Sequence, residues 1–251
     1  MKVQTNQSVG SIVTQCPSSI PLFEGLKIDY CCGGNKTLQD ACAAAGASLE
    51  KVLQSLDEIP GALDRGQNWD EKGLSELVGF LVEKHHAYTR EQLALLEKLS
   101  EKVARVHGQN HPELLALRGV FRQIADELEP HMVKEEQVAF PYLLALEKSV
   151  QGGGDGELLF PYPVFQSQPQ RVLMADHETV GEQLREARRL TCDFKPPKDA
   201  CVTFRAFYQA FVELEEDLHR HIHLENNVLF PMAEKLAQEF EARPKVSSRR
   251  G

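Results

Sequence analysis

Two segments of the chain repeat a pattern of side chains that can bind metal ions. Residues 131–141 read HMVKEEQVAFP and residues 221–231 read HIHLENNVLFP, so histidine, glutamate, phenylalanine and proline recur at identical offsets. A histidine and a glutamate four residues apart lie on one face of an α-helix. One such pair alone is most simply a hydrogen bond on a solvent-facing surface, but the repetition indicates two helices that present their pairs to a shared site. The repeated residues are His131, Glu135, Phe140 and Pro141, and His221, Glu225, Phe230 and Pro231.

The donor types indicate which metals such a site would accept. Imidazole together with carboxylate suits iron, manganese or zinc better than the softer copper(I). We expect further ligands from two other helices, namely His177 and one of the adjacent His85 and His86, between which helical periodicity does not decide. With two histidines per metal and both glutamates bridging, each ion would keep an exchangeable position, which distinguishes reactive from structural sites.

A second arrangement of carboxylates and histidines competes with this one. Glu83 with His86, and Glu216 with His219, have the Glu-x-x-His spacing of ferritin-like carboxylate sites. That arrangement needs a lone glutamate from each of two other helices and leaves the repeated element unexplained. Residues 213–217 form an acidic run, which usually marks a solvated helix face. We therefore favour the repeated element and expect four histidines to lie outside the site: His107, His111, His219 and His223.

Helices must position these side chains, and the chain has the pattern for them. Apolar residues recur at helical spacing from residue 74 onwards, and strand-like alternation is almost absent. Short connections favour antiparallel neighbours. The sequence therefore predicts an all-α fold, an up-down four-helix bundle preceded by a small helical domain. The predicted bundle helices are 74–107, 112–148, 168–191 and 199–240, and the shorter N-terminal ones are 20–26, 38–45 and 49–56.

Glycine- and proline-rich stretches at residues 59–73 and 151–163 interrupt the helical pattern. We take the first as a domain boundary. The predicted organisation is a helical N-terminal domain at 1–65, the bundle at 73–240, and a basic, frayed tail at 241–251.

Charge and composition exclude several classes of partner. The formal net charge is -9, which disfavours a nucleic-acid backbone or an anionic membrane surface as partner. The N-terminus has no apolar segment typical of a secretory signal, and no apolar run has membrane length, so we expect a cytoplasmic protein. The six cysteines contain no C-x-x-C pair, which favours reduced thiols.

Cys31 and Cys32 are adjacent and precede Gly33-Gly34. They are either small residues of a flexible turn or a mobile dithiol that binds iron, nitric oxide or the thiols of a partner. Because adjacent cysteines form a mutual disulfide only with strain, metal or partner chemistry is favoured over a structural bridge.

Five segments of the chain together resemble the repair of iron centres (RIC) family: DYCCGG at residues 29–34, HHAYTREQL, HMVKEEQVAFP, DHETVGE and HIHLENNVLFP. The resemblance implies a small Cys-Cys-Gly-Gly domain joined to a hemerythrin-like bundle. It implies two non-haem iron ions with an oxo or hydroxo bridge. The implied ligands are His86, His131, His177 and His221, with Glu135 and Glu225 bridging. The family commonly has tyrosine where this chain has His85. An oxygen-carrying hemerythrin would instead have a second histidine at position 135.

The resemblance also implies a function. We expect a stress-response protein that helps to repair iron-sulfur clusters damaged by nitric oxide or oxidants by donating iron, with Cys31 and Cys32 as an iron, nitric oxide or thiol relay. Damaged iron-sulfur proteins would be its partners, and a homodimer is compatible with this role. Two alternatives are an enzyme that reduces nitric oxide or peroxide at the di-iron centre, and a sensor of diatomic gases. The absence of a recognisable signalling domain in the sequence disfavours the sensor.

Overall fold

A computed structural model of the chain describes residues 3–59, 69, 72–152, 158 and 160–242. Over these residues the predicted all-α class is confirmed, because helices dominate and no strand forms. Most of the predicted interdomain boundary and of the predicted tail at 241–251 lies outside the described residues. No helix in the described ranges is long and apolar enough to span a lipid bilayer.

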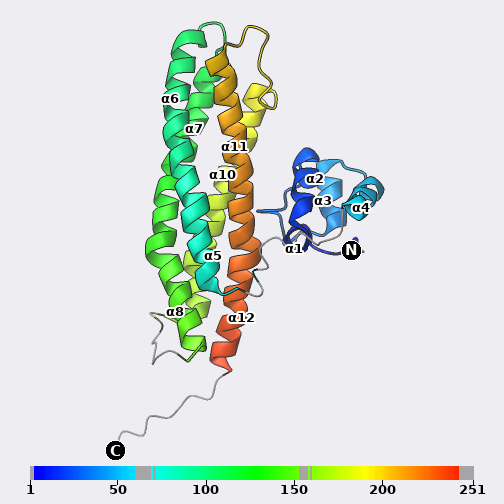
Figure 1. The fold of residues 1–251 in the computed structure, drawn as a ribbon, viewed down its shortest axis with the longest axis vertical. Helices are drawn as coiled ribbons and strands as arrows, with labels where there is room; N and C mark the ends of the chain where they lie inside the picture. Colours follow the sequence, from blue (N-terminus) through cyan, green and yellow to red (C-terminus); the bar gives the residue numbers. More distant parts are fainter. Residues whose placement is uncertain (1–2, 60–68, 70–71, 153–157, 159, 243–251) are drawn as a thin grey trace, which may run out of the picture.

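Four long rods form an up-down bundle, and each rod combines α-helices with one π-helical turn (Figure 1). In the bundle, α10 packs on α7, α11 on α6, and α12 on α8. The first rod is α5 (Leu74–Phe80), η3 (Leu81–His86) and α6 (Ala87–His107), and the second is α7 (Glu113–Lys134), η4 (Glu135–Ala139) and α8 (Phe140–Val150). The third is α9 (Tyr162–Phe165), η5 (Gln166–Gln170) and α10 (Arg171–Thr191), and the fourth is α11 (Val202–Leu224), η6 (Glu225–Leu229) and α12 (Phe230–Glu241).

The third rod begins at Tyr162, which is earlier than the predicted start at residue 168. The prolines that suggested a loop are compatible with a helix start. Pro163 lies in the first turn of α9, where a backbone N–H has no partner within the helix and its absence costs little.

The bundle has two apolar cores, and the buried histidines and glutamates lie between them along the rods. One core joins α6, α7, α10 and α11 through side chains such as Phe121, Phe204 and Phe211. The other joins α5, α8 and α12 through side chains such as Leu143 and Ala233. Because each large apolar side chain that is buried contributes about 1.5–3 kcal/mol, these cores can support a polar layer between them.

The N-terminal residues form a separate cluster of helices against one side of the bundle, next to α11 (Figure 1). Its helices are α1 (Val9–Gln15), η1 (Pro17–Ser19), α2 (Ile20–Gly25), α3 (Leu38–Ala45) and α4 (Leu49–Glu58). Thr37 caps α3 by accepting a hydrogen bond from Asp40 N at 3.1 Å. Ile222 of α11 belongs to the apolar core of this cluster, so the two parts of the chain share buried surface.

Candidate metal centre

Four histidines and two glutamates meet in the polar layer of the bundle. They come from all four rods, and each has at most 2% of its surface exposed. The six residues are His86, His131, Glu135, His177, His221 and Glu225. The structure therefore brings together the six residues that the family resemblance implies as metal ligands.

Each glutamate lies between two histidines. The Glu135 carboxylate has one oxygen 3.3 Å from His86 Nε2 and the other 3.2 Å from His131 Nε2. Glu225 repeats the arrangement, with one oxygen 3.1 Å from His177 Nε2 and the other 3.0 Å from His221 Nε2.

The donors divide into two groups of four that share both glutamates. One group contains His86 and His221, and the other contains His131 and His177; within each group the ligand atoms lie within 4.8 Å of one another. A carboxylate has two oxygens and can therefore contact two cations at once. Both donor groups thus have the composition and spacing of a metal site, and Glu135 and Glu225 belong to each of them.

The hydrogen bonding of the six side chains tests whether a metal fits. His86 Nε2, both carboxylate oxygens of Glu135 and one of Glu225 have no hydrogen bond in the described structure, although a facing nitrogen or oxygen lies about 3 Å away. Burying such groups unpaired costs several kcal/mol. Cations between the facing atoms would satisfy them, and a nitrogen and oxygen donor set suits iron. The residues therefore fit bound metal.

Three of the histidines are held by partners on the far side of the ring. His86 Nδ1 lies 2.7 Å from Glu136, His131 Nδ1 3.1 Å from Asp176, and His177 Nδ1 3.1 Å from Asn226 Oδ1. Because Nδ1–H donates to these oxygens, the Nε2 lone pair is left for a metal. Arg90 and Lys134 in turn bind the carboxylates of Glu136 and Asp176, respectively. The sequence gives no signal for these partners, since their spacing to the histidines shows no helical regularity.

Burial and neighbouring charges shift the pKa values of the cluster in opposite directions. Burial lowers the pKa of His131, but Glu135, Glu225 and Asp176 outweigh it and raise this pKa to about 9. At His221 burial prevails, so its pKa falls below the ordinary value. Burial alone would raise the pKa of Glu225, yet His221 and His177 hold it well below its usual range. Without metal, a protonated His131 and an ionised Glu225 therefore lie in the same buried cluster at neutral pH.

His85 lies outside both donor groups. Its Nδ1 is 3.1 Å from both carboxylate oxygens of Asp217, and its ring stacks on His221 at 5.4 Å between centroids. The structure thus separates two adjacent histidines that periodicity had left equivalent.

The ferritin-like alternative does not form. Glu83 is exposed, Glu216 approaches Arg220 at 3.8 Å, and neither belongs to a donor group of the described residues. The expectation that 213–217 is a solvated face is wrong in part. Glu215 is buried because its carboxylate faces Arg188 of α10 at 2.7 Å.

The remaining histidines also lie outside the donor groups. His219 and His223 contact the N-terminal helices: His219 Nδ1 lies 2.8 Å from Glu24, and His223 Nδ1 lies 3.4 Å from the Tyr30 carbonyl. Their spacing in the sequence indicated no role for them. Their function in packing the two parts of the chain depends on a contact between distant segments.

Both glutamates open a π-helical turn that the sequence analysis did not predict. Glu135 begins η4 and Glu225 begins η6, and each turn ends just before a Phe-Pro pair. Proline lacks the N–H that the α-helical ladder requires, so Pro141 and Pro231 were the available signal. Phe140 stacks on His86 with ring centroids 5.6 Å apart, which fixes that imidazole against the core.

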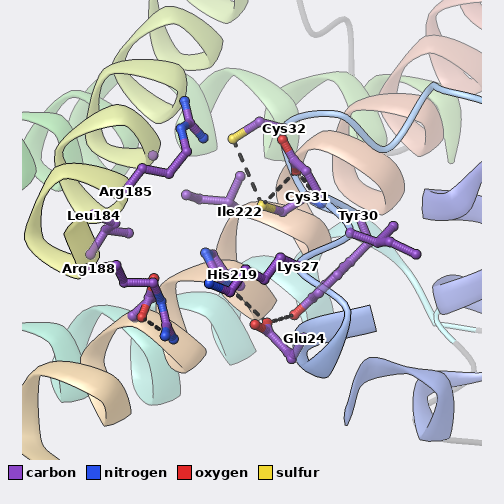
Figure 2. Close-up of a pocket in the computed structure, with 14 residues that line it drawn as sticks. Glu24, Lys27, Tyr30, Cys31, Cys32, Leu184, Arg185, Arg188, His219 and Ile222 are labelled. Carbon is purple, nitrogen blue, oxygen red and sulfur yellow. Dashed lines mark hydrogen bonds and ion pairs between the residues drawn. The ribbon is translucent and has the colours of Figure 1, made fainter. Parts of the chain in front are cut away.

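Cys31 and Cys32 lie in the loop between α2 and α3 and face the bundle (Figure 2). Their sulfur atoms are 3.9 Å apart and form no disulfide. Cys32 Sγ lies 3.7 Å from the backbone carbonyl of His177. Hydrogen bonding with Cys32, burial and the negative charge of Asp29 together raise the pKa of Cys31 well above its ordinary value. The fold thus places the dithiol beside a helix that contributes to the metal centre.

Comparison with known proteins identifies the family. The family described as Hemerythrin HHE cation binding domain matches residues 80–233, and ScdA_N, a Domain of Unknown function (DUF542), matches residues 5–59. The chain is 35% identical over 228 residues to the iron-sulfur cluster repair protein YtfE of Yersinia pseudotuberculosis serotype IB (strain PB1/+), covering 91% of this chain and 96% of that protein. It is 33% identical over 227 residues to the iron-sulfur cluster repair protein ScdA of Staphylococcus haemolyticus (strain JCSC1435), covering 90% and 97%. The hemerythrin match together with the His/Glu clusters implies iron binding. With both parts matched in order, the chain belongs to the family of iron-sulfur cluster repair proteins that join a ScdA_N segment to a hemerythrin-like domain.

Proposed function

We propose that the protein holds two iron ions in the bundle and donates iron to iron-sulfur clusters damaged by nitric oxide or oxidants. His86 and His221 would bind one ion, His131 and His177 the other, and both glutamates would bridge them. The observation that carries this proposal is the sharing of Glu135 and Glu225 by both donor groups. The oxo or hydroxo bridge, the stress-response role and a cytoplasmic location belong to the same proposal.

The donor chemistry supports delivery. Among the protein side chains of this site, iron would be held only by imidazole and carboxylate groups. Soft thiolate and sulfide ligands favour iron in clusters, so transfer from the bundle to a sulfur-rich acceptor is the favourable direction. The hydrogen bonds from the histidine Nδ1 atoms to Glu136, Asp176 and Asn226 hold the imidazoles in place during loading and release.

The test is a transfer experiment. The iron-loaded protein is incubated anaerobically with an enzyme whose iron-sulfur cluster has been damaged by nitric oxide, with sulfide supplied in excess. We expect recovery of the acceptor's activity and an equivalent loss of iron from the bundle. The metal-free Glu135→Ala variant should give no recovery. Failure of the loaded protein with an acceptor that free ferrous iron restores would refute the proposal.

A second candidate is reduction of nitric oxide or peroxide at the same centre. It is favoured by the small number of protein donors, four in each group, which leaves open positions on each ion. A cavity of about 530 Å³ beside His85, which stacks on His221, offers room for small molecules near the centre. With an external electron donor supplied, because each N2O formed from two NO consumes two electrons and two protons, sustained nitrous oxide formation that persists in the Cys31→Ser, Cys32→Ser double variant would favour this candidate over delivery.

A further inference from the structure

The three donors Asp29, Cys31 and Cys32 have the spacing of a tetrahedral metal site. Cys31 Sγ lies 3.9 Å from Cys32 Sγ and 3.4 Å from Asp29 Oδ1, and the three ligand atoms all lie within 4.8 Å of one another. Around a tetrahedral ion with bonds of about 2.3 Å to sulfur and about 2.1 Å to oxygen, the sulfur–sulfur edge is about 3.8 Å and the sulfur–oxygen edge about 3.6 Å. The metal-free loop therefore already has close to the required dimensions.

The loop backbone is fixed by its own hydrogen bonds. Asp29 Oδ1 accepts from Cys31 N at 3.2 Å and from Gly33 N at 2.9 Å, which closes the loop around the two sulfurs. A mutual disulfide is disfavoured, because the Cα atoms of adjacent residues are about 3.8 Å apart, closer than the usual range for disulfides. Both thiols thus remain available.

Asn227 of η6 holds this loop against the bundle. Its Nδ2 donates to Tyr30 O at 3.3 Å and to Cys31 O at 3.0 Å. The Asn227 amide fits between Gly10 and Gly34. A side chain at either position would clash with it, because a Cβ at Gly10 would lie 2.4 Å from Asn227 Oδ1 and a Cβ at Gly34 would lie 2.2 Å from it. Only glycine leaves room for this close approach, so the loop and Asn227 are shaped to each other.

The same turn of η6 reaches the metal centre of the bundle. Glu225 belongs to both donor groups, and the next residue, Asn226, accepts from His177. The following residue, Asn227, holds the dithiol loop. Three consecutive side chains therefore connect the two places, and Cys32 Sγ lies 3.7 Å from the carbonyl of His177.

A cavity of about 210 Å³ adjoins the three donors. Figure 2 shows the two sulfur atoms on the face of the loop that is turned toward Arg185, Leu184 and Ile222. Two thiolates and a carboxylate would supply three negative charges, and Arg185, which lines the same cavity, would offset part of them. With only three protein donors, an ion would keep one position for an exchangeable ligand in the cavity.

We propose that Asp29, Cys31 and Cys32 form a second, separate metal site that takes one divalent cation of intermediate softness, such as ferrous iron, cobalt or zinc. Two thiolates select this class over magnesium, calcium or manganese. Asn227 is a positioning residue that holds the site next to His177. As part of the proposed function, this site receives iron that leaves the bundle, while its existence as a metal site does not depend on that role.

The test uses cobalt(II), because sulfur-to-cobalt charge-transfer absorption reports thiolate ligands and the bundle donors contain no sulfur. Full-length protein is titrated anaerobically with the exposed Cys192 and Cys201 replaced by serine throughout. The second of these lies 3.1 Å from His107 Nε2 and would otherwise offer cobalt another thiol. We expect the absorption to saturate at the intensity of one thiolate-bound cobalt per chain, whatever cobalt the bundle takes up, and Cys31→Ser or Cys32→Ser to abolish it.

Two further variants sharpen the test. Asp29→Asn keeps a carbonyl acceptor for the loop amides but removes the charged donor, so the cobalt dissociation constant should rise at least about tenfold. Cys42→Ser, at a buried thiol of the same helical cluster, should change nothing. Circular dichroism checks that each variant is folded. A missing absorption, or one that survives Cys31→Ser or keeps its affinity in Asp29→Asn, would overturn the proposed site. An error in the proposed iron site of the bundle would appear separately, because the iron content of Glu135→Ala would then equal that of the unaltered protein.

Discussion

Replacing a bridging glutamate and replacing one histidine should have different effects on the number of bound irons. Each donor group contains two histidines and both glutamates. Glu135→Ala therefore removes a donor from both groups, whereas His131→Ala removes a donor from one group only. We compare these two variants directly, and Glu135→Gln serves as a variant of nearly unchanged shape.

The size of the effect follows from the ligand count. Mutating a residue that merely holds a metal ligand costs about 10- to 100-fold in metal affinity. Loss of one of four direct donors should lower the metal affinity by at least the upper end of this range. That is about 100-fold, or about 2.8 kcal/mol for each affected ion. After dialysis we expect two irons per chain in the unaltered protein, one in His131→Ala and none in Glu135→Ala.

The assay is iron quantification per chain together with the visible absorption spectrum of the loaded protein. Glu83→Ala and Glu216→Ala are matched controls, because these carboxylates lie outside both donor groups and should leave the iron content unchanged. Equal retention of iron by Glu135→Ala and His131→Ala would refute the shared-glutamate arrangement. Loss of iron from the Glu83 or Glu216 variant, with full retention in Glu135→Ala, would restore the ferritin-like alternative.

Three other outcomes are expected. Asp176→Asn should lower the affinity for one of the two irons about 10- to 100-fold in a competition titration with a chelator. The reason is that Asp176 Oδ2 lies 3.1 Å from His131 Nδ1 and holds this imidazole in place. Burial lowers the pKa of His131 but its acidic neighbours raise it to about 9, so metal must displace a proton below that pH. Affinity should therefore rise with pH up to about 9, by about tenfold per unit for one displaced proton, as measured by metal titration at several pH values. Glu147→Ala should lower the free energy of unfolding by about 0.5–2 kcal/mol in urea denaturation, because Glu147 accepts from Leu74 N at 2.6 Å and Ser75 N at 3.1 Å at the start of α5.

The repeated His-x-x-x-Glu element was readable from the sequence because it depends on local geometry. One helical turn separates His131 from Glu135 and His221 from Glu225 in any helix, so residue spacing predicts a shared face. The all-α class followed in the same way from apolar residues at helical spacing, and it is confirmed. Proline was a less certain guide, since Pro163 begins a helix where a loop was expected.

The tertiary structure decided which residues of different rods meet. His85 and His86 are adjacent and both buried, and only packing turned His86 toward Glu135 and His85 toward Asp217. The partnership of Asn226 with His177, and of Asn227 with the Cys31 loop, joins segments far apart in the chain. Local spacing fixes the face of a helix on which a side chain lies, but the neighbour that it meets there depends on the crossing and register of rods packed by two apolar cores. For this reason the sequence indicated a metal site and its principal donors, while the pairing of those donors and their connection to the dithiol appeared only in the folded chain.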